Sequence, residues 1–168
     1  MQGKREIAPF SFEDITLRTL APRDLRLTLA WRNRDDARVW FKHPEPIAWA
    51  DHETWYAAYC AKPDDFTFVA ERDGQAFGQS AIYAIDPVRA RAEVGRFLVA
   101  PEWAGRGLMK KVCAATALLA AEVLALRELY LEVLAGNARA IAVYRACGFV
   151  VEPCDDARIL HMRRRLTP

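Results

Sequence analysis

The sequence lacks a long apolar run, a surplus of charge of one sign and a clustered cysteine motif. Its longest nearly apolar stretch, 112–126, contains Thr116 and Glu122 and is shorter than the roughly 20 residues that cross a bilayer. There are 24 lysines and arginines against 22 aspartates and glutamates, a net charge of +2. This balance disfavours a protein that mainly binds nucleic acid or anionic lipid. The arginine run 163–165 lies in an expected strand, where alternate side chains face opposite sides, so it does not form one basic patch. We therefore expect no membrane span and no nucleic-acid partner.

The cysteines and the amino-terminal segment carry no special signal. The four cysteines have neither CxxC spacing nor a neighbouring His/Cys set, so we expect no metal site and no disulfide framework, only reduced and mostly buried thiols. The basic residues of 1–14 are not followed by an apolar block, so we expect no secretory signal and a cytoplasmic protein. The length predicts a single domain over residues 1–168.

Helical and period-two patterns alternate along the chain, which predicts an α+β fold. Asp73-Gly74 predicts a hairpin, because these residues favour the positive φ of a tight turn. The succession strand, helix, strand over 93–134 predicts a parallel strand pair. We expect a mixed sheet of about six to seven strands with helices on both faces. The expected strands are 15–20, 66–70, 76–85, 93–99, 129–134, 149–151 and 158–166, and the expected helices are 24–33, 35–41, 52–61 with Asp51 as its cap, 107–126 and 137–147.

The stretch 99–111 joins a strand to a helix through a loop with two glycines. The first amides of a helix lack intrahelical partners and lie at the positive end of its dipole. Gly105 and Gly107 leave this backbone open to close approach, and Arg106 and Lys110 lie one helical turn apart. The loop is a candidate phosphate site, and a tight turn with solvated basic side chains is the alternative.

Asn137 and Tyr144 form a second candidate pair. They are seven residues apart, nearly two helical turns, so both can face one groove if a helix begins at Asn137. The alternative is that Tyr144 is a core aromatic whose hydroxyl is satisfied within the protein.

These stretches together resemble the GNAT superfamily of acetyl-CoA-dependent N-acetyltransferases, through a strand ending VAPEW, the loop AGRG, the strand LYLEVLAGN and the stretch NARAIAVYRACGF. The resemblance covers 76–149 and implies the GNAT fold, with a splayed parallel strand pair around acetyl-CoA as the cofactor. It also places Tyr144 beside the cofactor sulfur. The chain departs from the family's usual loop at Ala104, which replaces an arginine or glutamine, and at Met109, which replaces a small residue. The implied cofactor-binding residues are Leu98, Val99, Ala104, Gly105, Arg106, Gly107, Leu108, Met109, Lys110 and Asn137.

Direct acetyl transfer needs a base for the attacking amine and an acid for the departing thiolate. Tyr144 can supply that proton, since the ordinary pKa of tyrosine is about 10. Glu93 is the expected base, by loose resemblance to family members with a carboxylate there. The alternatives are an ion-paired Glu93 with a water that relays the proton, or one of the reserve bases Glu132 and His52.

The amino-terminal half, 12–85, is expected to recognise the acceptor, because 86–152 is occupied with the cofactor. Its pattern WRN…R.W followed by I…H..W resembles GNAT enzymes that acetylate nucleotide-linked deoxysugars, including those of the pseudaminic-acid pathway, within a RimJ/RimL-like layout. Aromatic rings stack on bases and sugars, and arginines pair with phosphate. The alternative is that the tryptophans form the core of a helix pair. The candidate acceptor-binding residues are Arg32, Asn33, Trp40, His52, Trp55 and Tyr83.

The predicted function is acetyl transfer from acetyl-CoA to a primary amine, with an amino-sugar nucleotide as the first choice. The alternatives are the α-amine of a protein or peptide, and a coenzyme A-binding domain without turnover. The expected partner is therefore a small-molecule amine that can be nucleotide-linked, and a homodimer is one option for the oligomeric state.

Overall fold

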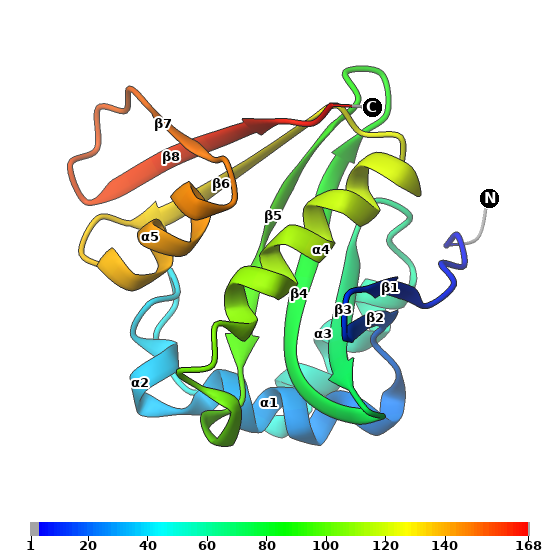
Figure 1. Cartoon of the computed structure of the whole chain (residues 1–168). Helices are drawn as coiled ribbons and strands as arrows, with labels where there is room; N and C mark the ends of the chain where they lie inside the picture. Colours follow the sequence, from blue (N-terminus) through cyan, green and yellow to red (C-terminus); the bar gives the residue numbers. More distant parts are fainter. Residues whose placement is uncertain (1–3, 168) are drawn as a thin grey trace.

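The computed structural model describes residues 4–167, which form an eight-stranded mixed sheet with helices on both faces (Figure 1). The sheet order is β1-β2-β3-β4-β5-β6-β8-β7, and β5–β6 is its parallel pair. Residues 1–3, which belong to the segment expected to carry no secretory signal, lie outside the described residues. The strands are β1 (Phe10–Phe12), β2 (Ile15–Thr19), β3 (Phe66–Arg72), β4 (Gln75–Asp86), β5 (Arg91–Val99), β6 (Glu128–Leu134), β7 (Val150–Glu152) and β8 (Ile159–Arg165). The helices are α1 (Leu25–Asn33), α2 (Asp35–Arg38), α3 (Trp49–Cys60), α4 (Leu108–Glu122) and α5 (Ala138–Ala146), with short 3-10 turns at η1 (Pro22–Asp24) and η2 (Pro101–Trp103).

The expected α+β architecture and its hairpin are confirmed. Asp73 and Gly74 have φ of 50° and 75°, and Arg72 pairs with Gln75 across this two-residue turn. The sheet has eight strands rather than six or seven, because the three-residue β1 pairs with β2 at the sheet edge. Three residues are too few for an alternating pattern to be visible in the sequence.

Several helix ends differ from the predicted ones. The helix α4 ends at Glu122 instead of 126, because Ala125 adopts a left-handed φ of 55° and the amide of Leu126 bonds to the carbonyl of Ala120 at 3.0 Å, which closes the helix. The helix α3 begins at Trp49, so Asp51 lies in its first turn and is not its cap. The helix α2 stops at Arg38, before the predicted end at 41.

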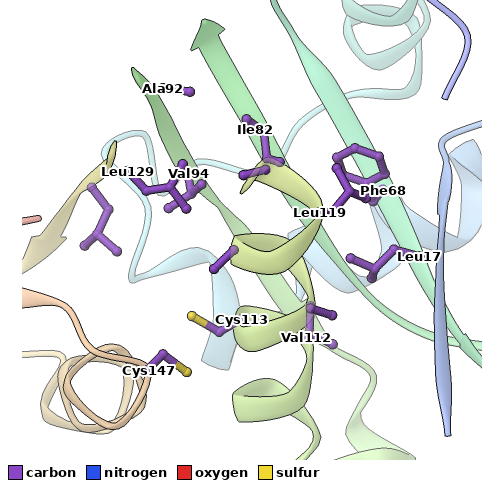
Figure 2. Close-up of a cluster of buried hydrophobic side chains, with 14 of the residues drawn as sticks. Leu17, Phe68, Ile82, Ala92, Val94, Val112, Cys113, Leu119, Leu129 and Cys147 are labelled. Atoms are coloured by element: carbon purple, nitrogen blue, oxygen red, sulfur yellow. The ribbon is translucent and has the colours of Figure 1, made fainter. Parts of the chain in front are cut away.

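The main core lies between the sheet and α4. Figure 2 shows Leu17, Phe68 and Ile82 from the sheet facing Val112 and Leu119 of α4. All five side chains are almost fully buried, with at most 2% of their surface exposed. This packing fixes α4 across the sheet and thereby sets where its first residues lie.

The opposite face of the sheet is covered by α1 and α3. Val69 on β3 packs there with Leu20, Leu25 and Tyr59. The expected burial of the thiols is half right, because Cys113 and Cys147 are buried whereas the other two cysteines are exposed.

No helix within residues 4–167 has the length and apolar character needed to cross a membrane. The same residues hold no group of three or more side chains placed to bind a metal ion.

Candidate active site

A cleft of about 1180 Å³ opens where β5 and β6 separate. The two strands pair only over Arg91 to Glu93 of β5 and Glu128 to Tyr130 of β6, and Figure 1 shows them diverging from this end. Beyond it, 94–99 and 132–134 line the cleft. Their facing backbone groups have no partner strand, so an extended ligand arm can hydrogen-bond between them.

The loop before α4 has the geometry of an anion site. Gly105 and Gly107 have φ of 76° and 71°, and a Cβ on either would meet no atom within 4 Å, so bare backbone faces open space. Among the residues that the structure describes, no side chain caps the start of α4, so its first amides lack a capping partner. Lys110 adds positive charge to the same lining. The loop therefore fits a diphosphate group.

Nine of the ten expected cofactor-binding residues line the cleft, including the departures Ala104 and Met109. The exception is Arg106, which is exposed, donates to the carbonyl of Glu102 at 3.0 Å and lies over the ring of Trp103 at 5.2 Å. Lys110 is therefore the better placed cation for a bound phosphate.

Asn137, the cap of α5, and Tyr144 on α5 both line the cleft, as the seven-residue spacing predicts. The Asn137 Oδ1 accepts the amide of Ala140 at 3.2 Å and so caps the helix. The ring of Tyr144 packs on Phe97 of β5, with 5.6 Å between ring centroids. Burial, reinforced by two nearby thiols, raises the pKa of Tyr144. Its hydroxyl therefore stays protonated at neutral pH.

Glu93 lies at the point where β5 and β6 part, on the cleft wall. The Tyr83 hydroxyl donates to its Oε1 at 3.0 Å. A Cβ on Gly95 would lie only 2.7 Å from that hydroxyl, so only glycine, which has no Cβ, fits at this position without displacing Tyr83. Burial, followed by the charge of Glu93, raises the pKa of Tyr83, so the phenol remains a donor to the carboxylate. The carboxylate is thus held in one orientation at the cleft.

A bulge in β5 places Arg96 beside this pair. Gln79 pairs with Leu98 and Ala81 with Gly95, so β5 has one extra residue, and Arg96 adopts a φ of 54°. Its guanidinium lies 4.5 Å from the centre of the Tyr83 ring. It also forms two hydrogen bonds, at 2.7 and 2.9 Å, with the buried carboxylate of Asp65. The bulge thus anchors the tyrosine that orients Glu93.

The sequence interpretation missed Arg96, Asp65 and Gly95. The only available signal was Gly95 within an apolar strand, since an isolated glycine there is typical of a bulge or of a close approach.

The candidate acceptor-binding residues divide into two groups. Arg32, Trp40 and Tyr83 line the cleft. Asn33, His52 and Trp55 do not line it. The Asn33 amide exchanges two hydrogen bonds, both 2.8 Å, with the backbone of Ile47, and so it fixes the segment before α3.

His52 and Trp55 pack against other aromatic side chains instead of lining the cleft, which agrees with the alternative of a structural role. Their rings stack on each other at 5.2 Å, and Trp55 also stacks on the buried Tyr59 at 5.3 Å. Burial lowers the pKa of His52, whose Nε2 is enclosed and has no hydrogen-bond partner in the part of the chain that the structure describes. His52 lies outside the cleft, so the structure does not place it as a base for the reaction.

Comparisons with known proteins agree with this geometry. The chain matches the family model of the acetyltransferase (GNAT) domain over residues 14–150. The spermidine N(1)-acetyltransferase of Escherichia coli K12 is 32% identical over 143 residues, which are 84% of this chain and 76% of that protein. The corresponding enzyme of Vibrio cholerae serotype O1 is 29% identical over 82% of this chain and 80% of its own.

A solved structure of the same kind agrees in fold. The spermidine N-acetyltransferase from Vibrio cholerae in complex with CoA and spermine has a TM-score of 0.81 and 24% identity, and it covers 90% of this chain and 95% of its own. These relatives are named for spermidine, and so they give no support to a RimJ/RimL-like or amino-sugar-nucleotide subfamily. The family and the cofactor inferred from the glycine loop and from α5 are confirmed. The chain belongs to the GNAT acetyltransferase family and is an acetyl-CoA-dependent N-acetyltransferase.

Proposed function

We propose that the acceptor is a primary amine on a molecule that also bears an anionic group, with an amino-sugar nucleotide as its class. The observation that carries this proposal is the charge of the acceptor end of the cleft, defined as the lining residues of 32–43, 83–96 and 132. Three cations in this region each have a carboxylate partner, and Arg32 has none among the described residues. The pairs are Arg34 with Asp36 at 3.1 Å, Lys42 with Glu132, and Arg96 with Asp65 at 2.7 Å.

Arg32 supports the anionic part of the acceptor. Its Nη2 donates to the carbonyl of His43 at 2.5 Å and its guanidinium lies 4.1 Å from the centre of the Phe41 ring. Its Nη1 is enclosed and has no hydrogen-bond partner within residues 4–167. An enclosed donor without an acceptor is costly, so a phosphate or carboxylate that reached it would be bound favourably. The neighbouring ring of Trp40, 45% exposed on the cleft wall, offers a stacking surface for a base or sugar.

A polyamine is the second candidate acceptor, because the curated relatives at 29–32% identity are spermidine acetyltransferases. Glu93 has no cationic partner among the described residues and could hold one ammonium group. A second ammonium would meet the positive charges of Arg32 and Lys42 in the same cleft. We therefore expect spermidine to be a poorer acceptor than an amine with an anionic group.

The roles of the side chains follow from their positions in the cleft. Acetyl-CoA supplies the thioester, with its diphosphate at the loop 104–109 and its arm between β5 and β6. Glu93, held by Tyr83, takes the proton that the amine must lose in order to attack. Tyr144, kept protonated by burial, donates a proton to the departing thiolate. Residues 12–85 would then contribute to the acceptor site, whereas 86–152 would hold the cofactor and also supply Glu93 and Glu132 to the acceptor site.

The test is release of free thiol from acetyl-CoA with three acceptor classes at matched concentration: amino-sugar nucleotides, spermidine and peptide α-amines. We expect the highest kcat/KM for an amino-sugar nucleotide. In the variant Arg32→Gln its KM should rise by about tenfold or more, because a charge-assisted hydrogen bond is lost, whereas the KM for spermidine should not rise. Turnover with spermidine alone, or equal effects of the variant on both acceptors, would reject the anionic acceptor.

A further inference from the structure

The side chain of Lys42 crosses the acceptor end of the cleft. It follows α2 and lines the cleft, and its Nζ pairs with Oε2 of Glu132 on β6. The lysine side chain is 62% exposed and the glutamate side chain 30%. An ammonium group of the chain itself therefore lies in the space where an acceptor amine must enter.

The segment that carries Lys42, residues 41–48, is tied down on both sides. The Arg38 Nη1 donates to the carbonyl of Pro44 at 2.8 Å, and Asn33 holds both backbone groups of Ile47. Trp40 lies against Gly136 of the β6–α5 loop, 3.8 Å from the position of a Cβ there. Figure 1 shows the segment, in cyan, rising from α2 toward that loop. These contacts keep Lys42 at the cleft.

Two carboxylates, one on each of the parting strands, act on this ammonium. The hydrogen bond to Glu132 is the main cause that raises the pKa of Lys42, partial burial opposes it, and the charge of Glu93 on β5 adds to the rise. The other neighbour of Glu132 is the Nε2 of His161, at 3.5 Å. Two observations therefore point to an ammonium-binding site here: the carboxylates of Glu93 and Glu132, and the Lys42 ammonium group that they already attract.

We propose that Glu132, with Glu93, forms the subsite for the ammonium group of the acceptor, and that Lys42 occupies this subsite until the acceptor displaces it. The inference rests on the proposed function only in that the acceptor is a primary amine. An incoming ammonium has the same charge and donor geometry as the lysine head group, so it replaces one ion pair with an equivalent one. The released Lys42 is then free to pair with an anionic group of the same acceptor. Glu93 stays beside the amine and can take its proton.

The test uses n-butylamine, which reproduces the lysine side chain and carries no anion. Its KM is measured by thiol release at saturating acetyl-CoA, and its Kd by NMR titration of the protein saturated with CoA. The variant Lys42→Met should lower both constants about two- to fivefold, which is the range spanned by an exposed lysine–carboxylate pair. Glu132→Gln should raise both by about threefold or more, and the effect should fall on KM rather than kcat.

Two matched variants control for charge. Lys62→Met removes the same charge from an exposed position outside the cleft and should leave both constants as in the wild type. Glu122→Gln removes the same charge as Glu132→Gln, but from an exposed position outside the cleft, and should also keep the wild-type values. Equal constants in Lys42→Met and Lys62→Met, or no effect of Glu132→Gln, would overturn the subsite. Because butylamine has no anionic group, this result is independent of whether amino-sugar nucleotides are acetylated.

Discussion

Gly95→Ala is the change that best tests how Glu93, the proposed base, is held. The backbone at Gly95 is outside the left-handed region, so alanine fits it without strain. The new Cβ would lie 2.7 Å from the Tyr83 hydroxyl but 3.4 and 3.5 Å from the nearest ring carbons, which are ordinary contacts. The oxygen is rigidly bonded to its ring, so the Tyr83 side chain must shift as a whole, and its 3.0 Å hydrogen bond to Glu93 is lost.

The expected size of the effect follows from that single bond. A hydrogen bond to a charged group contributes about 2 kcal/mol, which for a chain of this length corresponds to a fall in Tm of roughly 4–8 °C. Misplacing a catalytic group by about 1 Å can lower the rate by roughly 10²-fold. We therefore expect a modest loss of Tm by calorimetry and a much larger loss of kcat/KM by thiol release.

The refuting result comes from a double-mutant cycle. Tyr83→Phe removes the same hydrogen bond, and phenylalanine has no oxygen for the new Cβ to meet. Adding Gly95→Ala to Tyr83→Phe should therefore change Tm and kcat/KM little, with less than about 0.5 kcal/mol of further loss. Full activity of Gly95→Ala, or losses in the two variants that simply add, would refute the argument that Tyr83 positions Glu93.

Three further outcomes follow from the structure. Tyr144→Phe should lower kcat by roughly 10²–10⁴-fold and leave acetyl-CoA affinity unchanged by calorimetry, and an unchanged kcat would exclude it as the acid. Gly107→Ala forces a side chain onto a φ of 71° and should cost about 1–2 kcal/mol in thermal unfolding while weakening acetyl-CoA binding, whereas wild-type affinity would show that the loop backbone does not hold the diphosphate. Burial would raise the pKa of Asp24, but two hydrogen bonds from Arg18 at 2.7 and 2.8 Å outweigh it and the pKa is lowered. The Arg18–Asp24 pair therefore contributes its full stability above pH 3.8, the pKa of Asp24 in the unfolded chain, and this stability is lost as the pH falls through the lower pKa of the folded protein. Asp24→Asn should be destabilised by about 3 kcal/mol at pH 7. The variant should also lose this acid dependence in unfolding experiments.

The hairpin of the first half and most of the second half could be predicted because local rules decide them. A glycine with positive φ before a helix, the turn at Asp73-Gly74 and the cap at Asn137 all depend on residues within a few positions of one another. The α4 core follows from apolar periodicity in the same way. Such features are visible in one segment of sequence, so the fold could be predicted, and the same kind of feature marks the proposed cofactor loop.

The bulge at Arg96 could not be predicted, because its cause is distant in sequence. Arg96 is held by Asp65, 31 residues earlier, and its strand is irregular only relative to its partner β4. The pattern of β5 by itself reads as a regular strand. The hydrogen bond between Tyr83 and Glu93 depends on the same cross-strand register.

The tryptophans of the first half show a second limit of sequence reasoning. Trp31 is 3% exposed in a small core with Ala37 and Leu98, whereas Trp40, nine residues later, is 45% exposed on the cleft. Both lie on or beside short helices, where spacing alone does not tell which face meets the sheet. The aromatic pattern that suggested a sugar nucleotide is therefore mostly a packing pattern, with Trp40 as the exception.

The proposed acetyl-CoA site and the acceptor end of the cleft differ in the groups that would hold the ligand. This difference determines how much the ligands of related proteins reveal about each of the two sites. The proposed donor site is made mainly of backbone: the amides before α4 and the edges of β5 and β6 that face the cleft. Backbone groups survive most substitutions, so relatives at 29–32% identity can share acetyl-CoA chemistry. The acceptor end is made of side chains, chiefly Arg32, Lys42, Glu93 and Glu132, and replacing a single one reverses or removes a charge. Similarity to spermidine acetyltransferases therefore supports the reaction more strongly than the acceptor, and the acceptor should be sought by matching charges in the cleft.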